Sequence, residues 1–269
     1  MSAISEVFRR LKADGDKGFI PFIMAGDPDL ETTKALVLEL ARRGSDVIEL
    51  GIPFSDPLAD GPTNQASAQR ALEAGTTLAG IFECVEDIRR DTDVPIIFMS
   101  YYNPIHQYGL EAFVDRCVEV GLNGALITDL PPEEAHPYSG LMKDAGLDTV
   151  FLLAPTSRDE RIKLVTGVAT GFVYYVSRAG VTGEQQVLAD SLVPMIERIK
   201  SFTTKPLAVG FGISNPEQAE EVARHADAVV VGSAIVRRIG EKGGDPDLVP
   251  QIGDFVADLM RPLKASSAN

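Results

Sequence analysis

The sequence predicts an α/β fold of the (β/α)8 TIM-barrel class with an extra N-terminal helix. Eight short apolar runs recur along the chain, and a longer segment with helical periodicity follows each of them. Strand and helix alternating in this way indicate a parallel sheet, and eight such units are the number that closes into a barrel. An open, doubly wound parallel sheet is the structural alternative.

Each expected strand is nearly continuous in apolar character rather than alternating, as a strand buried on both faces must be. The expected strands are 19–24, 47–50, 96–100, 125–128, 149–153, 172–176, 207–210 and 228–231. The expected helices are 31–43, 77–90, 110–120, 133–145, 159–168, 192–202, 216–225 and 249–263.

The N-terminal segment, residues 1–15, is expected to form an amphipathic helix that caps the bottom of the barrel. Its apolar residues Ile4, Val7, Phe8 and Leu11 follow helical spacing, and charges interrupt them. No stretch approaches the ~20 apolar residues that span a bilayer. We therefore expect one domain over residues 1–269, a frayed tail at 263–269 and a cytoplasmic protein.

Composition limits the classes of partner. The 25 basic and 39 acidic residues give a net charge of −14, which repels nucleic acid and anionic lipid. Backbone amides at helix N-termini must therefore hold any anionic substrate. Cys84 and Cys117 have no disulfide framework around them and indicate reduced, packed thiols. The three histidines have no metal-ligand spacing, and no metal is expected.

The first candidate site follows the second strand, because active sites of barrels lie at the C-terminal ends of the strands. Glu49 ends this apolar run, and the long loop after it, residues 51–63, carries Asp56 and Asp60. A Glu in apolar surroundings can exchange a proton near neutrality, whereas a solvated Asp stays ionised. The alternative is structural: Glu49 paired with a buried Lys or Arg, and the two Asp residues capping turns.

The second candidate site consists of the turns after the seventh and eighth strands. Gly212 precedes a Ser214-x-x-Glu217 pattern that marks a helix start, and Gly232-Ser233 follows the last strand. Phosphate sites of barrels are commonly built from these two turns. A third feature, residues 177–184, places two glycines around Thr182 after the sixth strand. It indicates a lid over bound substrate, or else an ordinary surface turn.

The loop motifs together resemble the tryptophan synthase α-subunit family along essentially the whole chain. The matching segments are Phe19 to Phe22 with Ala25-Gly26-Asp27-Pro28, Glu49 to Pro62, Tyr101-Tyr102-Asn103-Pro104, Asp129-Leu130-Pro131, Ser177 to Gly183 and Gly210 to Ser214. The resemblance implies a lyase of tryptophan biosynthesis that splits indole-3-glycerol phosphate into indole and glyceraldehyde 3-phosphate by a retro-aldol reaction.

The resemblance also implies residue roles. Glu49 corresponds to the acid/base that moves protons between the substrate hydroxyl and indole C3, and Asp60 to the carboxylate that holds the indole N–H. Thr182 corresponds to the lid threonine that helps to place Asp60. Phosphate-binding positions correspond to Gly183, Gly212, Gly232 and Ser233. The indole pocket corresponds to Phe22, Leu126, Tyr174 and Phe211.

Three further residues, Asp56, Pro57 and Asn103, fall on the face that meets the β subunit in this family. The resemblance implies an α2β2 heterotetramer in which indole passes to the β subunit. Pyridoxal phosphate is then expected on that partner alone, with no cofactor on this chain. One departure is Asn64, which stands where many relatives carry an apolar residue.

Three other functions are open to a chain of this kind. The first is another phosphate-binding barrel of the same pathway, an indole-glycerol-phosphate synthase or an anthranilate-sugar isomerase, against which the segment from Glu49 to Asp60 argues. The second is a barrel without activity that acts only as an allosteric partner. The third is a standalone lyase that releases free indole, which a single sequence does not separate from a subunit.

Overall fold

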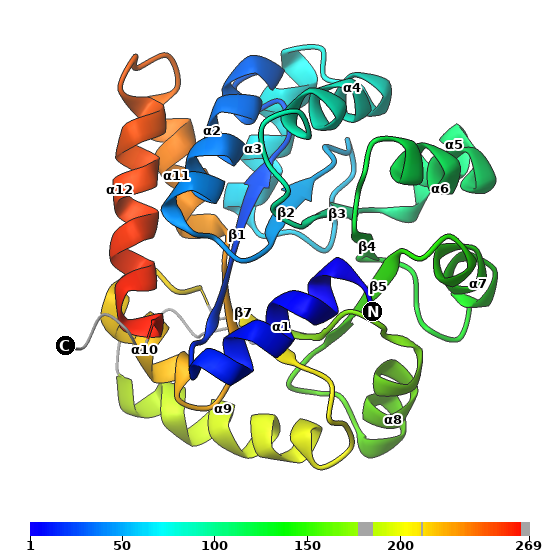
Figure 1. Ribbon diagram of the computed structural model, residues 1–269, viewed down its shortest axis with the longest axis vertical. Helices are drawn as coiled ribbons and strands as arrows, with labels where there is room; N and C mark the ends of the chain where they lie inside the picture. The colour runs from blue at the N-terminus through cyan, green and yellow to red at the C-terminus, as the bar shows by residue number, and fades with distance from the viewer. Residues whose placement is uncertain (177–184, 211, 265–269) are drawn as a thin grey trace.

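A closed barrel of eight parallel strands forms the centre of the computed structural model, which describes residues 1–176, 185–210 and 212–264 (Figure 1). Neighbouring strands pair in chain order, and β8 pairs with β1 to close the ring. The barrel prediction is therefore confirmed and the doubly wound alternative is wrong. The strands are β1 (Gly18–Met24), β2 (Ile48–Gly51), β3 (Ile96–Ser100), β4 (Gly124–Ile127), β5 (Asp148–Leu153), β6 (Val173–Val176), β7 (Leu207–Gly210) and β8 (Ala228–Val231).

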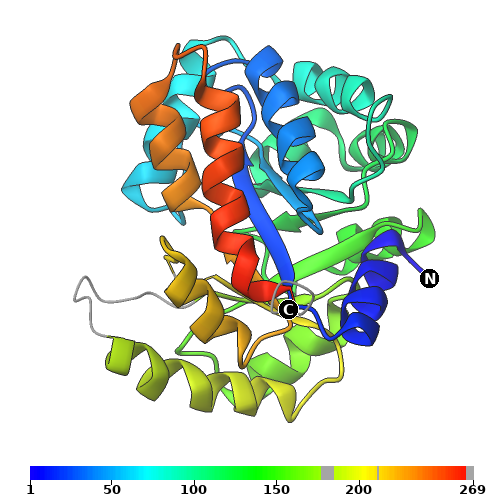
Figure 2. The ribbon, with the colours of Figure 1, turned by 60° about the vertical axis from the view of Figure 1, so that its left-hand side comes forward.

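Helices surround this barrel on its outer side (Figure 2). They are α1 (Ala3–Asp14), α2 (Leu30–Arg43), α3 (Pro62–Glu73), α4 (Leu78–Ile88), α5 (Tyr102–Tyr108), α6 (Leu110–Glu119), α7 (His136–Asp144), α8 (Asp159–Val168), α9 (Gln185–Lys200), α10 (Pro216–Ala223), α11 (Ser233–Lys242) and α12 (Leu248–Met260), with a 3-10 turn at Arg261–Leu263. None of the helices in the described part of the chain has the length and apolar character that crossing a bilayer requires.

Three of these helices, α3, α5 and α11, were not among the expected ones. Helix α3 has no stripe of large apolar residues, since it buries only Ser67, Ala68 and Ala71. Helix α5 has only seven residues. Helix α11 follows directly from the Gly232-Ser233 turn, where the sequence indicated a helix start but not its length.

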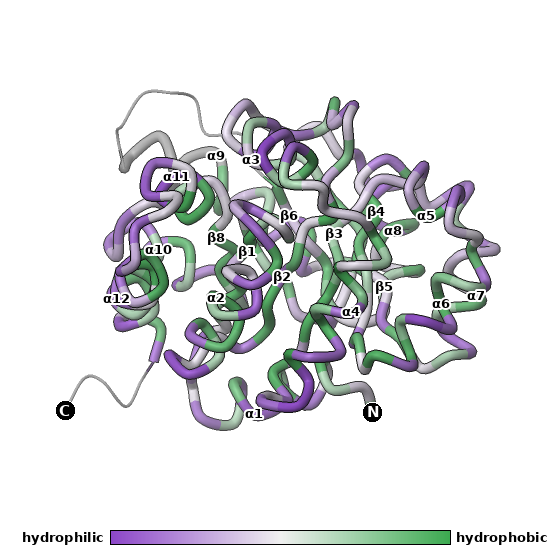
Figure 3. The backbone as a smooth tube through the Cα atoms, turned by 90° about the horizontal axis from the view of Figure 1, so that it is seen from above, coloured by the Kyte–Doolittle hydropathy of each residue, from purple (hydrophilic) through white to green (hydrophobic). Residues whose placement is uncertain are grey.

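Helix α1 closes the bottom of the barrel, as expected (Figures 1 and 3). Its buried face packs in one cluster with residues that point into the barrel, such as Val47, Val150 and Phe172. The rings of Phe8 and Phe172 lie 5.8 Å apart. A Cβ at Gly18, the first residue of β1, would lie 2.9 Å from Ala228 Cβ and 3.3 Å from Leu11 Cδ1, so the fit at this end is tight.

Alternation along each strand decides which side chains face the barrel axis. Ile20, Val47, Ile97 and Leu126 belong to the inner cluster, whereas their strand neighbours pack outward against the helices in a larger one. Figure 3 shows the hydrophobic segments gathered on the strands at the centre and the hydrophilic ones on the periphery. Glu49 on β2 lies two residues after the inward-facing Val47, so its side chain also points into the barrel.

Four side chains at the bottom rim each cap a neighbouring strand. Each precedes an even-numbered strand and accepts a hydrogen bond from a backbone N–H at the start of the odd-numbered strand before it. The four pairs are Asp46 with Phe19 N (2.9 Å), Asn123 with Ile96 N (2.9 Å), Thr170 with Thr149 N (2.8 Å) and Asp227 with Leu207 N (2.9 Å). At this rim, side-chain caps therefore join β1 to β2, β3 to β4, β5 to β6 and β7 to β8.

The expected frayed tail begins later than predicted. Leu263 is buried, and Lys264 Nζ lies 2.8 Å from the carboxylate of Asp46 and 3.3 Å from the carbonyl oxygen of Lys17. Residues 265–269 lie outside the described part of the chain. The end of the chain is thus tied to the same bottom rim that α1 covers.

We expect Asp46→Ala to lower the free energy of unfolding by roughly 2–4 kcal/mol, because it leaves Phe19 N–H unpaired and Lys264 without its carboxylate. Urea denaturation measures the effect. The control is Asp258→Ala, which removes an exposed ion pair 3.5 Å long and is expected to change stability by less than about 0.5 kcal/mol. Equal effects of the two substitutions would contradict the buried role of Asp46.

Candidate functional site

Glu49 lies on β2 near its C-terminal end, with its side chain inside the barrel and only 1% exposed. Its Cα is in register with that of Phe22 on β1. Both carboxyl oxygens are buried, and neither has a hydrogen-bond partner among the described residues. The structural alternative, a buried Lys or Arg paired with Glu49, is not found in this part of the chain.

This burial determines the protonation state of Glu49. Loss of solvation, and to a smaller extent the nearby Asp60 carboxylate, together raise the pKa of the Glu49 carboxyl from 4.5 to about 8. The protonated form therefore predominates at neutral pH. A carboxyl group in this state can donate a proton and then accept one.

Asp60 lies in the loop after β2 and is half-buried. Tyr101, the residue after β3, donates its hydroxyl to Asp60 Oδ2 at 2.8 Å, and Asn64 Nδ2 lies 3.4 Å from Oδ1. Burial raises the pKa of Asp60, whereas these two hydrogen bonds lower it. The two carboxyl groups thus have unlike surroundings: Glu49 has no donor within the described part of the chain, whereas Asp60 has a donor at each oxygen.

Tyr101 was missed as a site residue, although it lies in one of the family segments. Its hydroxyl also accepts a hydrogen bond from Ala59 N at 3.0 Å, so one phenol holds both the loop backbone and the Asp60 carboxylate. The available signal was its position directly after a strand, at the end of the barrel where sites form. Nothing else in the sequence predicts the hydrogen bond between Tyr101 and Asp60, because the two residues are 41 positions apart.

The start of α3 fixes Asp60 from its C-terminal side. Gln65 Nε2 donates to Asp60 O at 2.9 Å. Further along the helix, Arg70 binds the buried carboxylate of Asp27 through Nε at 2.8 Å and Nη2 at 2.6 Å, and Ser67 Oγ donates to the same carboxylate. Asp27 belongs to the loop after β1. This network connects the first two strand–helix loops.

Three of the residues expected to form the indole pocket lie on the inner side of the barrel. Phe22 is 2% exposed and Leu126 is fully buried, while Tyr174 on β6 is half-buried. Glycines leave the room that the rings occupy: a Cβ at Gly51 would lie 2.7 Å from Phe22 Cζ, and one at Gly210 would lie 2.9 Å from Tyr174 Oη. The fourth residue, Phe211, lies outside the described residues.

The expected phosphate-binding turns follow β7 and β8, which pair with each other. Gly212 has a φ of 66°, in the left-handed region that favours glycine. Gly232 is the N-cap residue of α11 and Ser233 its first residue. The N–H groups in the first turn of a helix lack the usual partner four residues back, but in α11 Ile235 N already donates to Gly232 O at 2.8 Å. Thr182 and Gly183, also expected here, lie outside the described residues.

One detail of the sequence interpretation is wrong. The N-cap of α10 is Asn215, whose side chain accepts from Gln218 N at 2.9 Å, and not Ser214. Gln218 Oε1 in turn accepts from Ser214 N at 2.9 Å. The helix begins at Pro216, as expected, and its first-turn amide at Gln218 is already occupied by the cap.

The residues expected at a partner interface lie on the surface beside this site. Asp56 and Asn103 are exposed and Pro57 is half-exposed. Leu58, which was not predicted, is 91% exposed.

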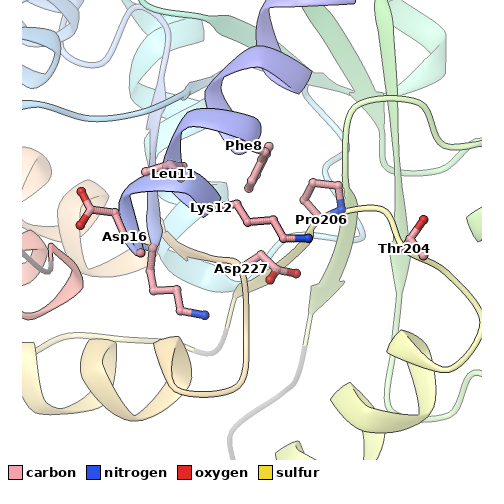
Figure 4. A pocket seen from close by; sticks show the side chains of 9 residues that line it. Phe8, Leu11, Lys12, Asp16, Thr204, Pro206 and Asp227 are labelled. Atoms are coloured by element: carbon pink, nitrogen blue, oxygen red, sulfur yellow. The ribbon is translucent and has the colours of Figure 1, made fainter.

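Other features of the described chain lie apart from this constellation. Cys84 and Cys117 are free and buried, as expected, and burial raises the pKa of Cys84 to about 11. Among the described residues, no three His, Cys, Asp or Glu side chains gather to hold a metal. A cavity of about 330 Å³ lies at the bottom of the barrel, between α1 and the segment before β7 (Figure 4). It is at the opposite end from Glu49.

Comparison with known proteins shows which family this chain resembles. Residues 8–252 match the family model described as tryptophan synthase alpha chain. The tryptophan synthase alpha chain of Geotalea uraniireducens is 51% identical over 265 residues, which are 98% of this chain and 99% of that protein. The one from Geobacter sulfurreducens is 48% identical over 263 residues, with the same two coverages.

Solved structures give the same result. Tryptophan synthase subunit alpha from Legionella pneumophila superposes with a TM-score of 0.91 at 37% identity, covering 98% of each chain. A chain of the tryptophan synthase complex from Pyrococcus furiosus superposes with a TM-score of 0.84 at 39% identity, covering 91% of this chain and 98% of that one. This chain belongs to the tryptophan synthase alpha chain family, the lyases that cleave indole-3-glycerol phosphate in tryptophan synthesis.

Proposed function

We propose that Glu49 is the acid and base of the cleavage of indole-3-glycerol phosphate to indole and glyceraldehyde 3-phosphate. In its protonated form Glu49 donates a proton to indole C3, which makes the ring cationic. The bond between C3 and the side chain then breaks, while Glu49 takes the proton of the side-chain hydroxyl, which becomes the aldehyde of the triose product. The observation that carries the proposal is a buried, donor-free carboxyl with a pKa of about 8.

Asp60 is the carboxylate that binds the indole N–H and stabilises the positive charge on the ring. An ionised group contributes most when it is fixed before the charge develops. The hydrogen bonds from Tyr101 and Asn64 support this role, because they orient both oxygens of Asp60 and favour its ionised form.

Binding of the substrate is assigned to the remaining expected residues. Phe22, Leu126, Tyr174 and Phe211 line the indole pocket, and Thr182 helps to place Asp60. The phosphate lies against the turns that contain Gly183, Gly212, Gly232 and Ser233. A net charge of −14 supports binding of the phosphate by backbone amides at the start of α11 rather than by the long-range field.

The partner is the tryptophan synthase β subunit, in an α2β2 assembly that receives indole at the face of Asp56, Pro57 and Asn103. Exposed Leu58 supports this choice of face. Pyridoxal phosphate belongs to the β subunit in this proposal, and acid–base chemistry alone is assigned to this chain, as one barrel domain. Two free, buried thiols support a cytoplasmic location.

Glu49→Gln is expected to reduce indole release by roughly 100-fold or more, because the amide transfers no proton. Asp60→Asn is expected to cost roughly 100-fold as well, because it removes the charge opposite the ring. Release of indole from indole-3-glycerol phosphate by the purified variants measures both effects, and circular dichroism checks the fold. Near-normal turnover of Glu49→Gln would refute the role of this residue.

Stability should depend on pH through the same carboxyl. Between pH 4.5 and about 8 Glu49 stays protonated in the folded chain but ionises in the unfolded one, so unfolding releases a proton. The free energy of unfolding therefore falls as pH rises through this window, by several kcal/mol in order of magnitude. Glu49→Gln should lack this decrease and be more stable than the parent at pH 8, but not at pH 4.

Thermal unfolding of both chains at pH 4 and pH 8 measures that difference. The control is Glu111→Gln, which changes an exposed residue of α6 and should follow the parent at both values. If Glu49→Gln is no more stable than the parent at pH 8, the proposed protonation state of Glu49 is wrong.

Addition of purified β subunit separates a subunit from a standalone lyase. We expect indole-3-glycerol phosphate cleavage to accelerate when the β subunit is added, and Asp56→Lys to weaken this stimulation. The control Asp258→Lys changes an exposed residue of α12, away from the proposed face, and should be stimulated like the parent. An unchanged rate at saturating β subunit favours the standalone lyase.

A further inference from the structure

Asn64 contacts the Asp60 carboxylate from the first turn of α3. Its Nδ2 lies 3.4 Å from Asp60 Oδ1, while the Tyr101 hydroxyl lies 2.8 Å from Oδ2. Each carboxylate oxygen thus has its own side-chain donor. The two donors come from different elements, the end of β3 and the start of α3, so they fix the carboxylate from two directions.

The other end of the Asn64 amide is in an unfavourable environment. Its Oδ1 is buried and has no hydrogen-bond partner among the described residues. A buried acceptor without a partner destabilises the folded chain. Rotating the amide by half a turn would not help, because Oδ1 would then face the Asp60 oxygen and repel it. Within the described part of the chain, the hydrogen bond to Asp60 is therefore the one polar contact that the Asn64 side chain makes.

We propose that Asn64 is a positioning residue for the lyase reaction, which holds the Asp60 carboxylate oriented and ionised toward the indole N–H. The inference rests on the role proposed above for Asp60. Asn64 acts through Asp60 and is not itself assigned a contact with the substrate.

The charges around Asp60 define what the loss of Asn64 would do. Among the described residues, the titratable groups that face Asp60 are Glu49 from β2 and Tyr101 from the end of β3, and Glu49 in turn faces Tyr174 from β6. Burial raises the pKa of Asp60, and the Asn64 amide is one of the two donors that oppose this. Without it, Asp60 takes up a proton at a higher pH and the active form is lost sooner on acidification.

The test is the pH profile of kcat/KM for indole-3-glycerol phosphate cleavage by Asn64→Leu, an apolar substitution of similar size. The acid limb of the Asn64→Leu profile should move to higher pH. We expect kcat/KM to fall by roughly three- to tenfold at pH 6, and by less toward pH 8, because one weak hydrogen bond to a charged group is lost. The alkaline limb, which reports Glu49, should stay in place, because Asp60 is ionised there in both proteins. The loss should be in kcat more than in KM.

Two further variants make the test specific. Asn64→Asp places a second carboxyl beside Asp60, and its acid limb should move further than that of Asn64→Leu. The matched control is Gln69→Leu on the same helix, whose amide donates to exposed Glu73 at 2.8 Å. Its profile should coincide with that of the parent.

Thermal stability distinguishes positioning from a structural role. Asn64→Leu removes a buried unpaired acceptor, so its Tm should equal or exceed that of the parent. A lowered Tm with the same loss of activity at every pH would overturn the proposal, as would an acid limb that does not move. If Asp60→Asn keeps its activity, the role of Asp60 fails instead. An inactive Asp60→Asn beside an unmoved acid limb in Asn64→Leu disproves the inference about Asn64 alone.

Discussion

A carboxyl group inside an apolar barrel is the constraint on which the rest of this site depends. Strand alternation turns Glu49 inward with Val47 and Gly51, and no described residue gives it a hydrogen bond. Such a group remains protonated near neutrality because water cannot reach it. Burial therefore provides the acid, and the other residues of the site are needed chiefly to keep a second, ionised carboxylate close by.

That second carboxylate belongs to a loop with two separate tasks. Its end holds Asp60 through Tyr101 and the first turn of α3, whereas its middle leaves Leu58 almost fully exposed. A partner that covers Leu58 would contact a segment two residues from Asp60. The same short stretch of chain can thus connect an assembly surface to the charge that the reaction needs.

The barrel could be predicted because its strands are nearly continuous in apolar character, and their observed bounds differ little from the expected ones. Helices α3 and α5 could not, since one buries only small side chains and the other is two turns long. The cap of α10 was misplaced because Ser214 and Asn215 both suit an N-cap. The hydrogen bond from Gln218 N to Asn215 Oδ1, together with the extended backbone of Asn215, decides between them.

In the site, the positions of Glu49 and Asp60 follow from the rule that barrel loops after strands carry the chemistry. Their hydrogen-bond partners do not, because Tyr101 and Asp27 meet residues about 40 positions away. Pairing at that distance depends on the closed barrel and not on any local pattern. The roles of Thr182, Gly183 and Phe211 remain predictions, since these residues lie outside the described part of the chain.

The four rim caps have a consequence for how this architecture divides. Asp46, Asn123, Thr170 and Asp227 each join a strand to the one before it in an odd–even pair, so all four bonds fall within quarters of the barrel. Cleavage of the chain after β2, β4 or β6 would therefore break none of the four bonds, because both partners of each bond stay in the same fragment. With respect to these side-chain caps the ring is a fourfold repeat of two-strand modules, and backbone ladders join one module to the next.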